Sequence, residues 1–428
     1  MNKIKNLNDL ATTDLRRAAL NIAEAGLAAI DTDGAVKRAV RVEGDKLSIN
    51  NYQFDLASIK NLYVVGVGKC SLEAGAALED VLGERITGGI VIDVHKGTLK
   101  RIQTFAGSHP LPTDENMDAT KKIIDLLDAC KEDDLVIFII SGGGSTLLCQ
   151  PTNRACSEEA KIFNCLTDAG ADITELNTVR KHISLARGGF LAKYAYPARS
   201  VSLVFSDVPG NDIEFVASGP TMKDTTTIAD AQKVIARYDK KRECDFVASM
   251  MIETPKEDKY FEKVANVLVV SNDIALQAMA DEARRLGFSP QIMTTTMNEE
   301  AQAVGRDIAE ELKRSESKTA LLYGGETTVS VKSNGRGGRN LQLALSQLTD
   351  IKDGQLILTL ASDGRDNGEF AGAICDKVTL NVAEEKGIDI EKSLQENNSY
   401  PFFELVGNYI VTGDTGSNVS DLVIAIKE

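Results

Sequence analysis

The chain has 428 residues, of which 43% are hydrophobic and 26% are charged, and its formal net charge is −15. This length favours two domains, and the acidic balance disfavours general nucleic-acid binding. Charges interrupt every apolar stretch and the first residues lack the apolar core of a signal peptide, so we expect a cytoplasmic protein that does not enter a membrane.

Cysteine and histidine are too few and too scattered to indicate a zinc or histidine-rich metal site. The seven cysteines are odd in number and include no C-x-x-C pair, and there are only three histidines. Such cysteine usage fits a reducing compartment and predicts no disulfide framework.

Short β-rich runs alternate with helical patterns along the chain. In the first half, strands are expected at 62–68, 88–94, 135–140 and 202–207, with helices at about 71–82 and 115–130. In the second half, strands are expected at 266–272, 290–295, 319–325 and 356–364, with helices at about 273–287 and 299–313. This alternation predicts an α/β protein with parallel sheets covered by helices.

The charged, proline-containing stretch at about 240–260 is the expected domain boundary. It divides the chain into a first domain over 1–240 and a second domain over 260–428. A ligand is then expected in the cleft between the two domains.

The stretch YVVGVGKCS (63–71) predicts a strand, a glycine turn and a helix. The turn resembles a phosphate loop but is too short for the Walker A pattern. Lys69 would stand at the N-terminus of the helix, where its ammonium group could reach a phosphoryl oxygen. A tight turn with a solvated lysine is the alternative.

The stretch FIISGGGSTLL (138–148) places three glycines after a strand. Bare backbone there lets successive N–H groups converge on an anion, and the hydroxyls of Ser141 and Ser145 add donors. Close backbone packing and a sugar-phosphate site are alternatives. The pattern is not G-x-S-x-G, so a serine hydrolase elbow is missing.

Two further motifs complete the first half. In NTVRKHISLARGG (177–189), Arg180 is a candidate ligand for an anion, although a surface charge run is the usual explanation. His182 is expected to be a hydrogen-bonded structural residue. Asp207 ends a strong strand, which suits a metal ligand or a general base.

The second half contributes cations and carboxylates. Arg336 and Arg339 flank two glycines before a helix, a good arrangement for gripping phosphates. Asp363 and Asp366 follow a strand and could hold Mg²⁺ through oxygen ligands. Each motif alone could be structural, but together these groups are the components of phosphoryl transfer.

The motifs, taken in order, resemble the glycerate 2-kinases, the class II glycerate kinases whose C-terminal half is the MOFRL domain. The resemblance rests on GVGK, SGGGS, N-x-V-R-K-H, SDVPG-x-D with its ASGPT tail, GGETTV, GRGGRN, the SDG turn and the final TGDTGSNVSDL. It implies a Rossmann-like doubly wound parallel sheet domain and a smaller α/β domain with a mixed sheet. It also implies phosphorylation of D-glycerate to 2-phosphoglycerate, dependent on ATP and Mg²⁺.

The resemblance also implies residue roles. Lys69, Asp207 and Arg339 match the catalytic groups, with Asp207 and Asp363 as metal ligands. The implied substrate- and phosphate-binding residues are Ser141, Gly142, Gly143, Gly144, Ser145, Arg180 and Arg336. The implied nucleotide-binding residues are Gly66, Gly68, Gly325, Glu326 and Asn340.

At two places this sequence departs from the family pattern, and these departures leave alternative functions open. Family members usually have glutamate where this chain has Gln342, and the loop SDGRDNGEF carries Arg365 and Glu369. The acceptor could therefore be another small hydroxy acid, such as a four-carbon sugar acid. A hydroxypyruvate reductase would need a dinucleotide fingerprint, of which GVGKCS lacks the third glycine although Asp93 stands at the expected distance. A non-catalytic phosphometabolite sensor and both a monomer and a homodimer also remain open.

Overall fold

The computed structural model describes residues 2–152, 155–208, 210, 212–238 and 251–428. The chain forms two compact units, and each is described by itself. Unit 1 comprises Met1–Gly34, Asp207–Asn211 and Val270–Glu428, and unit 2 comprises Ala35–Ser206 and Asp212–Val269. The first 34 residues thus pack with the C-terminal half of the chain. Of the boundary stretch expected at 240–260, residues 240–250 lie outside the described residues.

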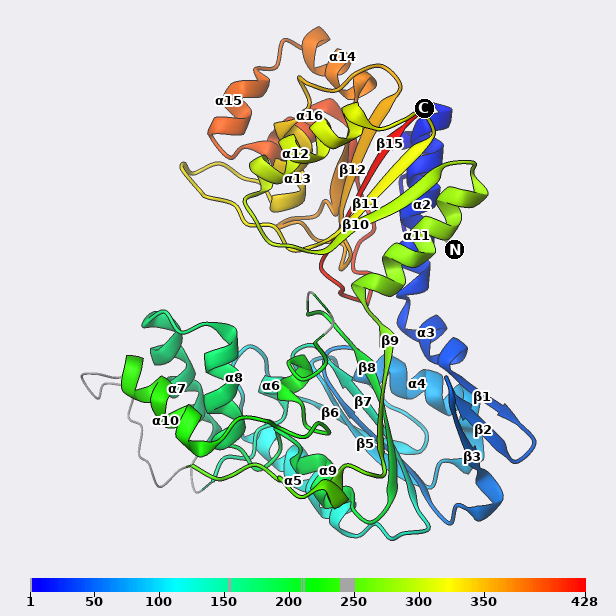
Figure 1. The fold of residues 1–428 in the computed structure, drawn as a ribbon, viewed down its shortest axis with the longest axis vertical. Helices are drawn as coiled ribbons and strands as arrows, with labels where there is room; N and C mark the ends of the chain where they lie inside the picture. Colours follow the sequence, from blue (N-terminus) through cyan, green and yellow to red (C-terminus); the bar gives the residue numbers. More distant parts are fainter. Residues whose placement is uncertain (1, 153–154, 209, 211, 239–250) are drawn as a thin grey trace. The chain divides into compact units, whose positions relative to one another are not determined.

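Unit 2 is built on a six-stranded parallel sheet (Figure 1). Its strands, in spatial order, are β6 (Ile102–Ala106), β5 (Gly88–Asp93), β4 (Leu62–Val67), β7 (Leu135–Ser141), β8 (Arg199–Phe205) and β9 (Val264–Val270). Every residue of β7 is buried, because helices cover the sheet. Helix α4 (Ser71–Leu82) packs on β4, β5 and β7, and α5 (Asp114–Asp128) packs on β5 and β6.

Unit 2 carries two additions that the strand and helix pattern did not predict. One is a three-stranded antiparallel sheet of β1 (Val40–Glu43), β2 (Lys46–Ile49) and β3 (Tyr52–Asp55). The other is a helical group of α7 (Cys156–Asp168), α8 (Ile173–His182) and α10 (Ile228–Tyr238), which has a small hydrophobic core of its own. The short helices α6 (Gly144–Leu147) and α9 (Phe190–Ala195) also belong to this unit.

Unit 1 contains a mixed sheet of six strands. Their spatial order is β10 (Ser289–Met297), β11 (Thr319–Gly325), β15 (Asp421–Lys427), β12 (Gln355–Ala361), β13 (Gly372–Asp376) and β14 (Tyr409–Ile410). Strands β10 and β11 pair in parallel, whereas the other neighbours in this sheet are antiparallel. The last strand in the chain, β15, therefore lies in the middle of the sheet.

Helices complete unit 1. From the second half of the chain come α11 (Asn272–Arg285), α12 (Ala301–Arg314), α13 (Arg339–Ser346), α14 (Lys377–Glu385), α15 (Ile390–Gln395) and α16 (Ser399–Val406). From the N-terminal segment come α1 (Leu7–Leu10) and α2 (Asp14–Ala29), and α3 (Thr32–Ala39) leads into unit 2. Helix α2 packs along α11 and on strands β12 and β15 (Figure 1), so the N-terminal segment is an integral layer of this unit.

A buried arginine fixes the N-terminal layer. Arg16 on α2 is 1% exposed and forms a bidentate ion pair with Asp376, with Nε to Oδ2 at 2.6 Å and Nη2 to Oδ1 at 2.8 Å. Its guanidinium group also donates to Asn408 Oδ1 and Thr379 Oγ1. Each charged group thus has partners despite its burial, as a buried ion pair requires.

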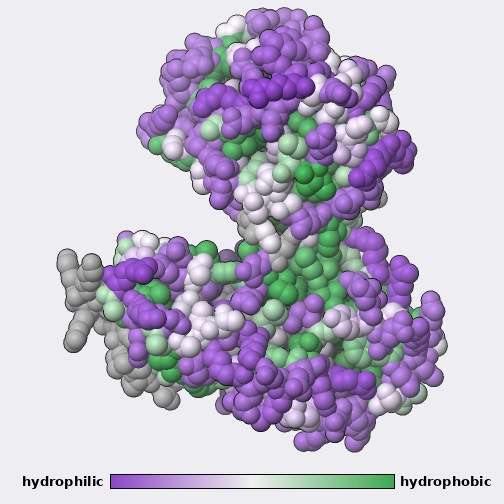
Figure 2. Space-filling model, viewed as in Figure 1, coloured by the Kyte–Doolittle hydropathy of each residue, from purple (hydrophilic) through white to green (hydrophobic). Residues whose placement is uncertain are grey.

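The strands and helices expected from the sequence are present with small differences at their ends. The pattern missed the short strands β1–β3, β6, β13 and β14, and it also missed β15, which has seven residues and is buried along nearly its whole length. Among the described residues, no helix combines the length and the apolar character needed to cross a membrane. On the face shown in Figure 2, hydrophilic side chains cover most of both units, in keeping with a charged residue content of 26%.

Removal of the buried arginine tests the role of the N-terminal layer. We expect Arg16→Ala to lower the free energy of unfolding by about 3–5 kcal/mol, because Asp376 is left as an unpaired buried charge. Urea unfolding followed by circular dichroism measures this change. The adjacent, exposed Arg17 is the matched control, and Arg17→Ala should change stability by less than about 0.5 kcal/mol. Equal effects of the two substitutions would contradict the assignment.

Candidate active site

Two predicted glycine turns of unit 2 lie against each other at the carboxyl ends of β4 and β7. The Lys69 backbone N–H donates to Gly142 O at 3.0 Å, and the Cys70 N–H donates to Ser141 Oγ at 3.4 Å. The exposed Lys69 side chain runs along Gly143, where an added Cβ would lie 3.0 Å from its Cε. The lysine and the SGGGS turn therefore form one local site.

Neighbouring atoms lie so close to Gly68 and Gly144 that only glycine fits at these two positions. Gly68 has φ +125°, and a Cβ there would lie 2.0 Å from Ser141 Oγ. A Cβ on Gly144 would lie 2.6 Å from that of Ala217. Close packing, which the sequence left open as an alternative to anion binding, thus accounts for these positions. It also brings a third segment, the ASGPT turn, onto the site.

The ASGPT turn holds two non-glycine residues in a left-handed conformation. Ala217 has φ 53° and Ser218 has φ 59°, an arrangement that costs free energy and tends to occur at functional sites. Ser218 Oγ donates to Asn177 Oδ1 at 2.9 Å, and Ser145 Oγ lies 2.8 Å from Ser218 Oγ. Because the Ser218 proton is used on Asn177, Ser145 is the donor to Ser218. This chain of bonds connects the SGGGS turn to α8.

Among the described residues, no carboxylate pairs directly with Arg180 on α8. Its Nη1 donates to Asn177 Oδ1 at 3.2 Å, and its guanidinium carbon lies 4.3 Å above the ring of Phe163. The nearby carboxylate of Glu159 is paired directly with the fully buried Arg187. Burial, together with the positive charge of Arg187, lowers the pKa of Arg180 to about 10. A bound anion would therefore stabilise the charged form of the Arg180 guanidinium group.

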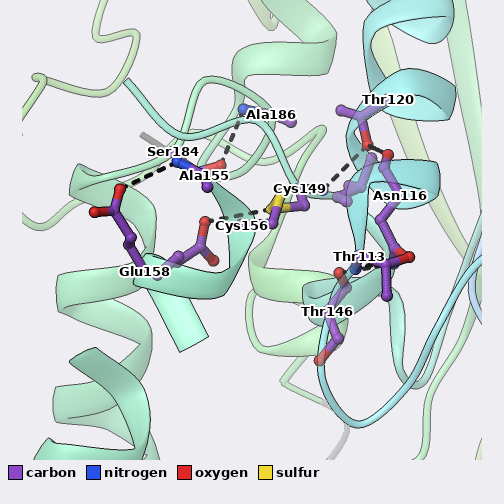
Figure 3. The surroundings of a disulfide bond; sticks show 12 residues. Thr113, Asn116, Thr120, Thr146, Cys149, Ala155, Cys156, Glu158, Ser184 and Ala186 are labelled. Carbon is purple, nitrogen blue, oxygen red and sulfur yellow. Dashed lines mark hydrogen bonds between the residues drawn. A yellow bond between two sulfur atoms is a disulfide. The ribbon is translucent and has the colours of Figure 1, made fainter. Parts of the chain in front are cut away.

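A disulfide bond next to this cluster corrects the expectation from the cysteine pattern. Cys149 and Cys156 are bonded, with their Cα atoms 6.1 Å apart. Figure 3 shows this bond beside α5, where Thr120 Oγ1 accepts from the Cys149 N–H. An odd cysteine count and the lack of a C-x-x-C pair therefore do not exclude disulfide bonds such as this one, which spans seven positions.

His182 is structural, as expected. It is fully buried, and its ring nitrogens lie 3.1 Å from Ile252 O and 3.2 Å from Thr226 Oγ1. The preceding Lys181 is also buried and pairs with Asp224 at 3.1 Å. These contacts anchor the C-terminal end of α8, so they help to hold Arg180 in place.

Asp93 does not have the position of a ribose-binding acid. It is 2% exposed, its Oδ2 accepts from the Leu72 N–H at 2.9 Å, and its Oδ1 accepts from the His95 N–H at 2.9 Å. Burial raises its pKa, against the lowering effect of these hydrogen bonds. The carboxylate is occupied in binding the first turn of α4, which weakens the dinucleotide-binding alternative.

A second group of predicted residues comes together in unit 1, around Arg339 at the start of α13. Its Nε donates to Asp421 Oδ2 at 2.5 Å, its Nη2 donates to Asp421 Oδ1 at 3.1 Å, and its Nη1 lies 2.8 Å from Glu326 Oε1. Asn340 Nδ2 also donates to Asp421 Oδ1 at 2.8 Å. Arg339 is therefore oriented by two carboxylates, and, as far as the described residues show, two of its five N–H donors stay available to a ligand.

Asp366 caps α13. Its Oδ1 accepts from the Asn340 N–H at 3.0 Å, and its Oδ2 accepts from the Leu341 N–H at 2.8 Å. The first N–H groups of this helix are thus already bound to a carboxylate and do not offer a phosphate site. The guanidinium group of Arg336 stacks on Tyr400 at 3.7 Å, and its role as a phosphate ligand stays a prediction.

The two candidate metal ligands belong to one set of hydrogen bonds in unit 1. Ser420 Oγ donates to Asp207 O at 3.4 Å, and Ser420 O accepts from the Ser362 N–H at 3.1 Å. Asp363 follows Ser362, and its Oδ1 accepts from the Arg365 N–H at 2.9 Å. The described residues contain no group of three or more side chains able to cage a metal ion.

The predicted residues thus fall into two groups. Gly66, Lys69, the SGGGS turn and Arg180 lie in unit 2, and Asp207, Gly325, Glu326, Arg336, Arg339, Asn340 and Asp363 lie in unit 1. Sequence reasoning missed Asp421, Asn177 and Ser218 as parts of these groups. All three residues lie inside motifs that the sequence analysis names. A polar side chain within such a motif was the signal that could have marked each of them as a site residue.

Two protein-family models match this chain. A family described as "Domain of unknown function (DUF4147)" matches residues 18–253, and the MOFRL family matches residues 319–421. Together the two family models cover most of the chain, residues 18–253 and 319–421.

Full-length relatives give the family. A "Glycerate 2-kinase" of Pyrococcus horikoshii is 38% identical, with 96% of this chain and 97% of that protein covered. The crystal structure of a glycerate kinase from Thermotoga maritima is similar, with a TM-score of 0.87, 32% identity and coverage of 96% and 99%. An Agrobacterium vitis protein, named "Putative hydroxypyruvate reductase", is 38% identical over 84% of this chain and 85% of its own. The chain belongs to the glycerate 2-kinase family.

The Asp421–Arg339 pair leads to a prediction for the pH dependence of activity. Burial raises the pKa of Asp421 to about 7, against the lowering effect of Arg339. As pH falls through this value the carboxylate is neutralised and its hold on Arg339 weakens, so kcat should decline on the acid side. Asp421→Asn should lower kcat and remove this acid limb from the pH–rate profile. An unchanged profile in the variant would assign the limb to another group.

Proposed function

We propose that this protein is a glycerate 2-kinase that transfers the γ-phosphoryl group of ATP to the 2-hydroxyl of D-glycerate. The proposal rests first on membership of the glycerate 2-kinase family. It rests also on two cationic side chains: Arg339 is held by two carboxylates, and Lys69 is exposed beside the SGGGS turn. Phosphoryl transfer depends on positioning and on neutralising negative charge. These fixed cations suit that chemistry.

In the proposed mechanism, Asp207 accepts the proton of the attacking hydroxyl. Lys69 and Arg339 stabilise the charge that develops on the transferred phosphoryl group. Lys69 belongs to unit 2, whereas Asp207 and Arg339 belong to unit 1. Gly66, Gly68, Gly325, Glu326 and Asn340 shape the surroundings of the nucleotide.

The carboxylates present fit Mg²⁺ as the partner of ATP. Magnesium is usually held by one or two carboxylates together with substrate phosphates, so a cage of three side chains is not needed. Asp207 and Asp363 would hold the ion, whose charge neutralises the phosphate oxygens of ATP.

Arg180 is proposed as the receptor for the carboxylate of glycerate. Arg180 and Arg187 share a single buried carboxylate, Glu159, which is bonded to Arg187. Within the described ranges the charge of Arg180 therefore has no direct carboxylate partner and is available to an anionic substrate, and Ser145 and Asn177 lie within the same set of hydrogen bonds. We expect activity on small hydroxy acids, a cytoplasmic location and no nucleic-acid partner.

A coupled assay tests the function. ADP should form only when ATP, Mg²⁺ and D-glycerate are all present, and enolase should dehydrate the product directly because it is 2-phosphoglycerate. A screen of C3 to C6 hydroxy acids then identifies the preferred acceptor. Oxidation of NADH with hydroxypyruvate, without ATP, would instead support a reductase. Binding of phosphorylated metabolites without turnover would support a sensor.

Lys69 gives the sharpest mechanistic test. We expect Lys69→Ala to lower kcat about 100- to 1000-fold, as expected for loss of one transition-state charge interaction, while the melting temperature stays unchanged. Lys60 is an exposed lysine of the same unit, and Lys60→Ala is the matched control. A kcat for Lys69→Ala close to that of the control would remove Lys69 from the mechanism.

Substitution of Arg180 tests the carboxylate receptor. Arg180→Gln should raise the KM for D-glycerate about 10- to 100-fold, because one charge-assisted pair is lost, and should leave the KM for ATP unchanged. Arg237, which is exposed and pairs with Glu175, gives the control Arg237→Gln. A rise in the KM for ATP alone would place the phosphates, and not the carboxylate, at Arg180.

A further inference from the structure

A loop of unit 2 brings a histidine beside the SGGGS turn. Residues 107–113 join β6 to α5, and His109 lies within this loop. A Cβ on Gly143 would lie 3.4 Å from His109 Cδ2 and 3.0 Å from Lys69 Cε. The two side chains therefore flank the same glycine, one from the loop before α5 and the other from the turn before α4.

One buried amide holds this loop in place. Asn116, in the first turn of α5, is fully buried, and its Oδ1 accepts from the Ser108 N–H at 2.9 Å. Its Nδ2 donates to Ser108 O at 3.1 Å and to Thr146 O at 3.3 Å. The amide thus connects the residue before His109 to the residue after Ser145, and Figure 3 shows both Asn116 and Thr146. The position of His109 is fixed by these backbone contacts and does not depend on its own ring.

The imidazole ring of His109 is available to a ligand. The residue is exposed, and in the part of the chain that the structure describes no hydrogen bond or ion pair involves its ring. Partial loss of solvent and the positive charge of Lys69 lower the pKa of His109, so its ring is neutral at pH 7. A neutral imidazole has one N–H donor and one acceptor. Beside an ammonium group, this donor adds a directed hydrogen bond without adding a second, repelling charge.

This pair of groups suits the oxygens of a phosphate group. Lys69 supplies a full positive charge, His109 supplies a neutral donor, and a side chain at Gly143 would crowd both of them. We propose that His109 is a further catalytic residue of this site, which donates a hydrogen bond to an oxygen of the phosphoryl group that Lys69 stabilises. The inference rests on the kinase function proposed above.

The carboxylate of glycerate is the other anion that such a pair could receive. Arg180 is the cation assigned above to that carboxylate, and it belongs to the hydrogen bonds around Asn177. His109 instead shares its neighbouring glycine with Lys69, the cation assigned to phosphoryl transfer. We therefore place the phosphoryl group, and not the carboxylate, at His109.

Kinetics of histidine variants test the assignment. We expect His109→Ala to lower kcat about 10- to 100-fold through loss of one donor to the transition state, with the KM for D-glycerate and the melting temperature unchanged. His109→Gln keeps a neutral N–H donor and should recover most of the lost activity. His95, an exposed histidine of the same unit on the loop after β5, gives the matched control His95→Ala, which should keep full activity.

Phosphate binding can be measured without turnover, because the chain has only three histidines. In the full-length protein with isotope-labelled histidine, inorganic phosphate should shift the nuclear magnetic resonance signals of the His109 ring. The signals of His95 and of the fully buried His182 should stay in place, and Lys69→Ala should weaken the response of His109. A response to D-glycerate but not to phosphate would overturn the assignment and place the substrate carboxylate at His109.

The outcomes separate this site from the kinase function. Full activity of His109→Ala, together with His109 signals that do not respond to phosphate, would overturn the proposal even if the protein phosphorylates glycerate. A response of His109 to phosphate in a protein that does not phosphorylate glycerate would refute the proposed function but support the phosphate site.

Discussion

The organisation of unit 1 depends on one carboxylate, that of Asp421. Its backbone begins β15, the strand that joins β11 and β12 in the middle of the sheet. Its side chain accepts hydrogen bonds from Arg339 and Asn340 at the start of α13. The same residue therefore completes the sheet and aims the guanidinium group that we assign to phosphoryl transfer. A buried carboxylate is tolerated there because each of its oxygens has a cationic or amide donor.

In unit 2, close contacts between backbone segments organise the candidate site, as Asp421 does in unit 1. Gly68 and Gly144 let three turns meet, and the left-handed Ala217 and Ser218 are held by this contact. Polar groups from separate segments then lie in one chain of hydrogen bonds, from Ser145 through Ser218 to Asn177 and Arg180. Rigid placement of this kind lowers the entropic cost of binding a small, flexible hydroxy acid.

The sequence predicted much of this fold because its strong signals are local. Buried strands such as 135–140 and the amphipathic helices are encoded in short windows, and the eight motifs were specific enough to indicate the family. Long-range partners have no such signal. Nothing near Arg16 predicts Asp376, 360 positions away, and nothing near Arg339 predicts Asp421. Local pattern also gave no sign that the Arg336 guanidinium group stacks on Tyr400 or that Asp366 caps a helix.

The discontinuity of unit 1 has a consequence for biosynthesis. Unit 2 is encoded between the two ends of the chain, so all of its strands have been made by residue 270. The sheet of unit 1 cannot close until its central strand, β15, has left the ribosome, and until then α2 has no finished surface to pack on. The pair that orients Arg339 is consequently among the last tertiary contacts to form. A nascent or truncated chain could hold a folded unit 2 and still be unable to hydrolyse or transfer phosphate from ATP.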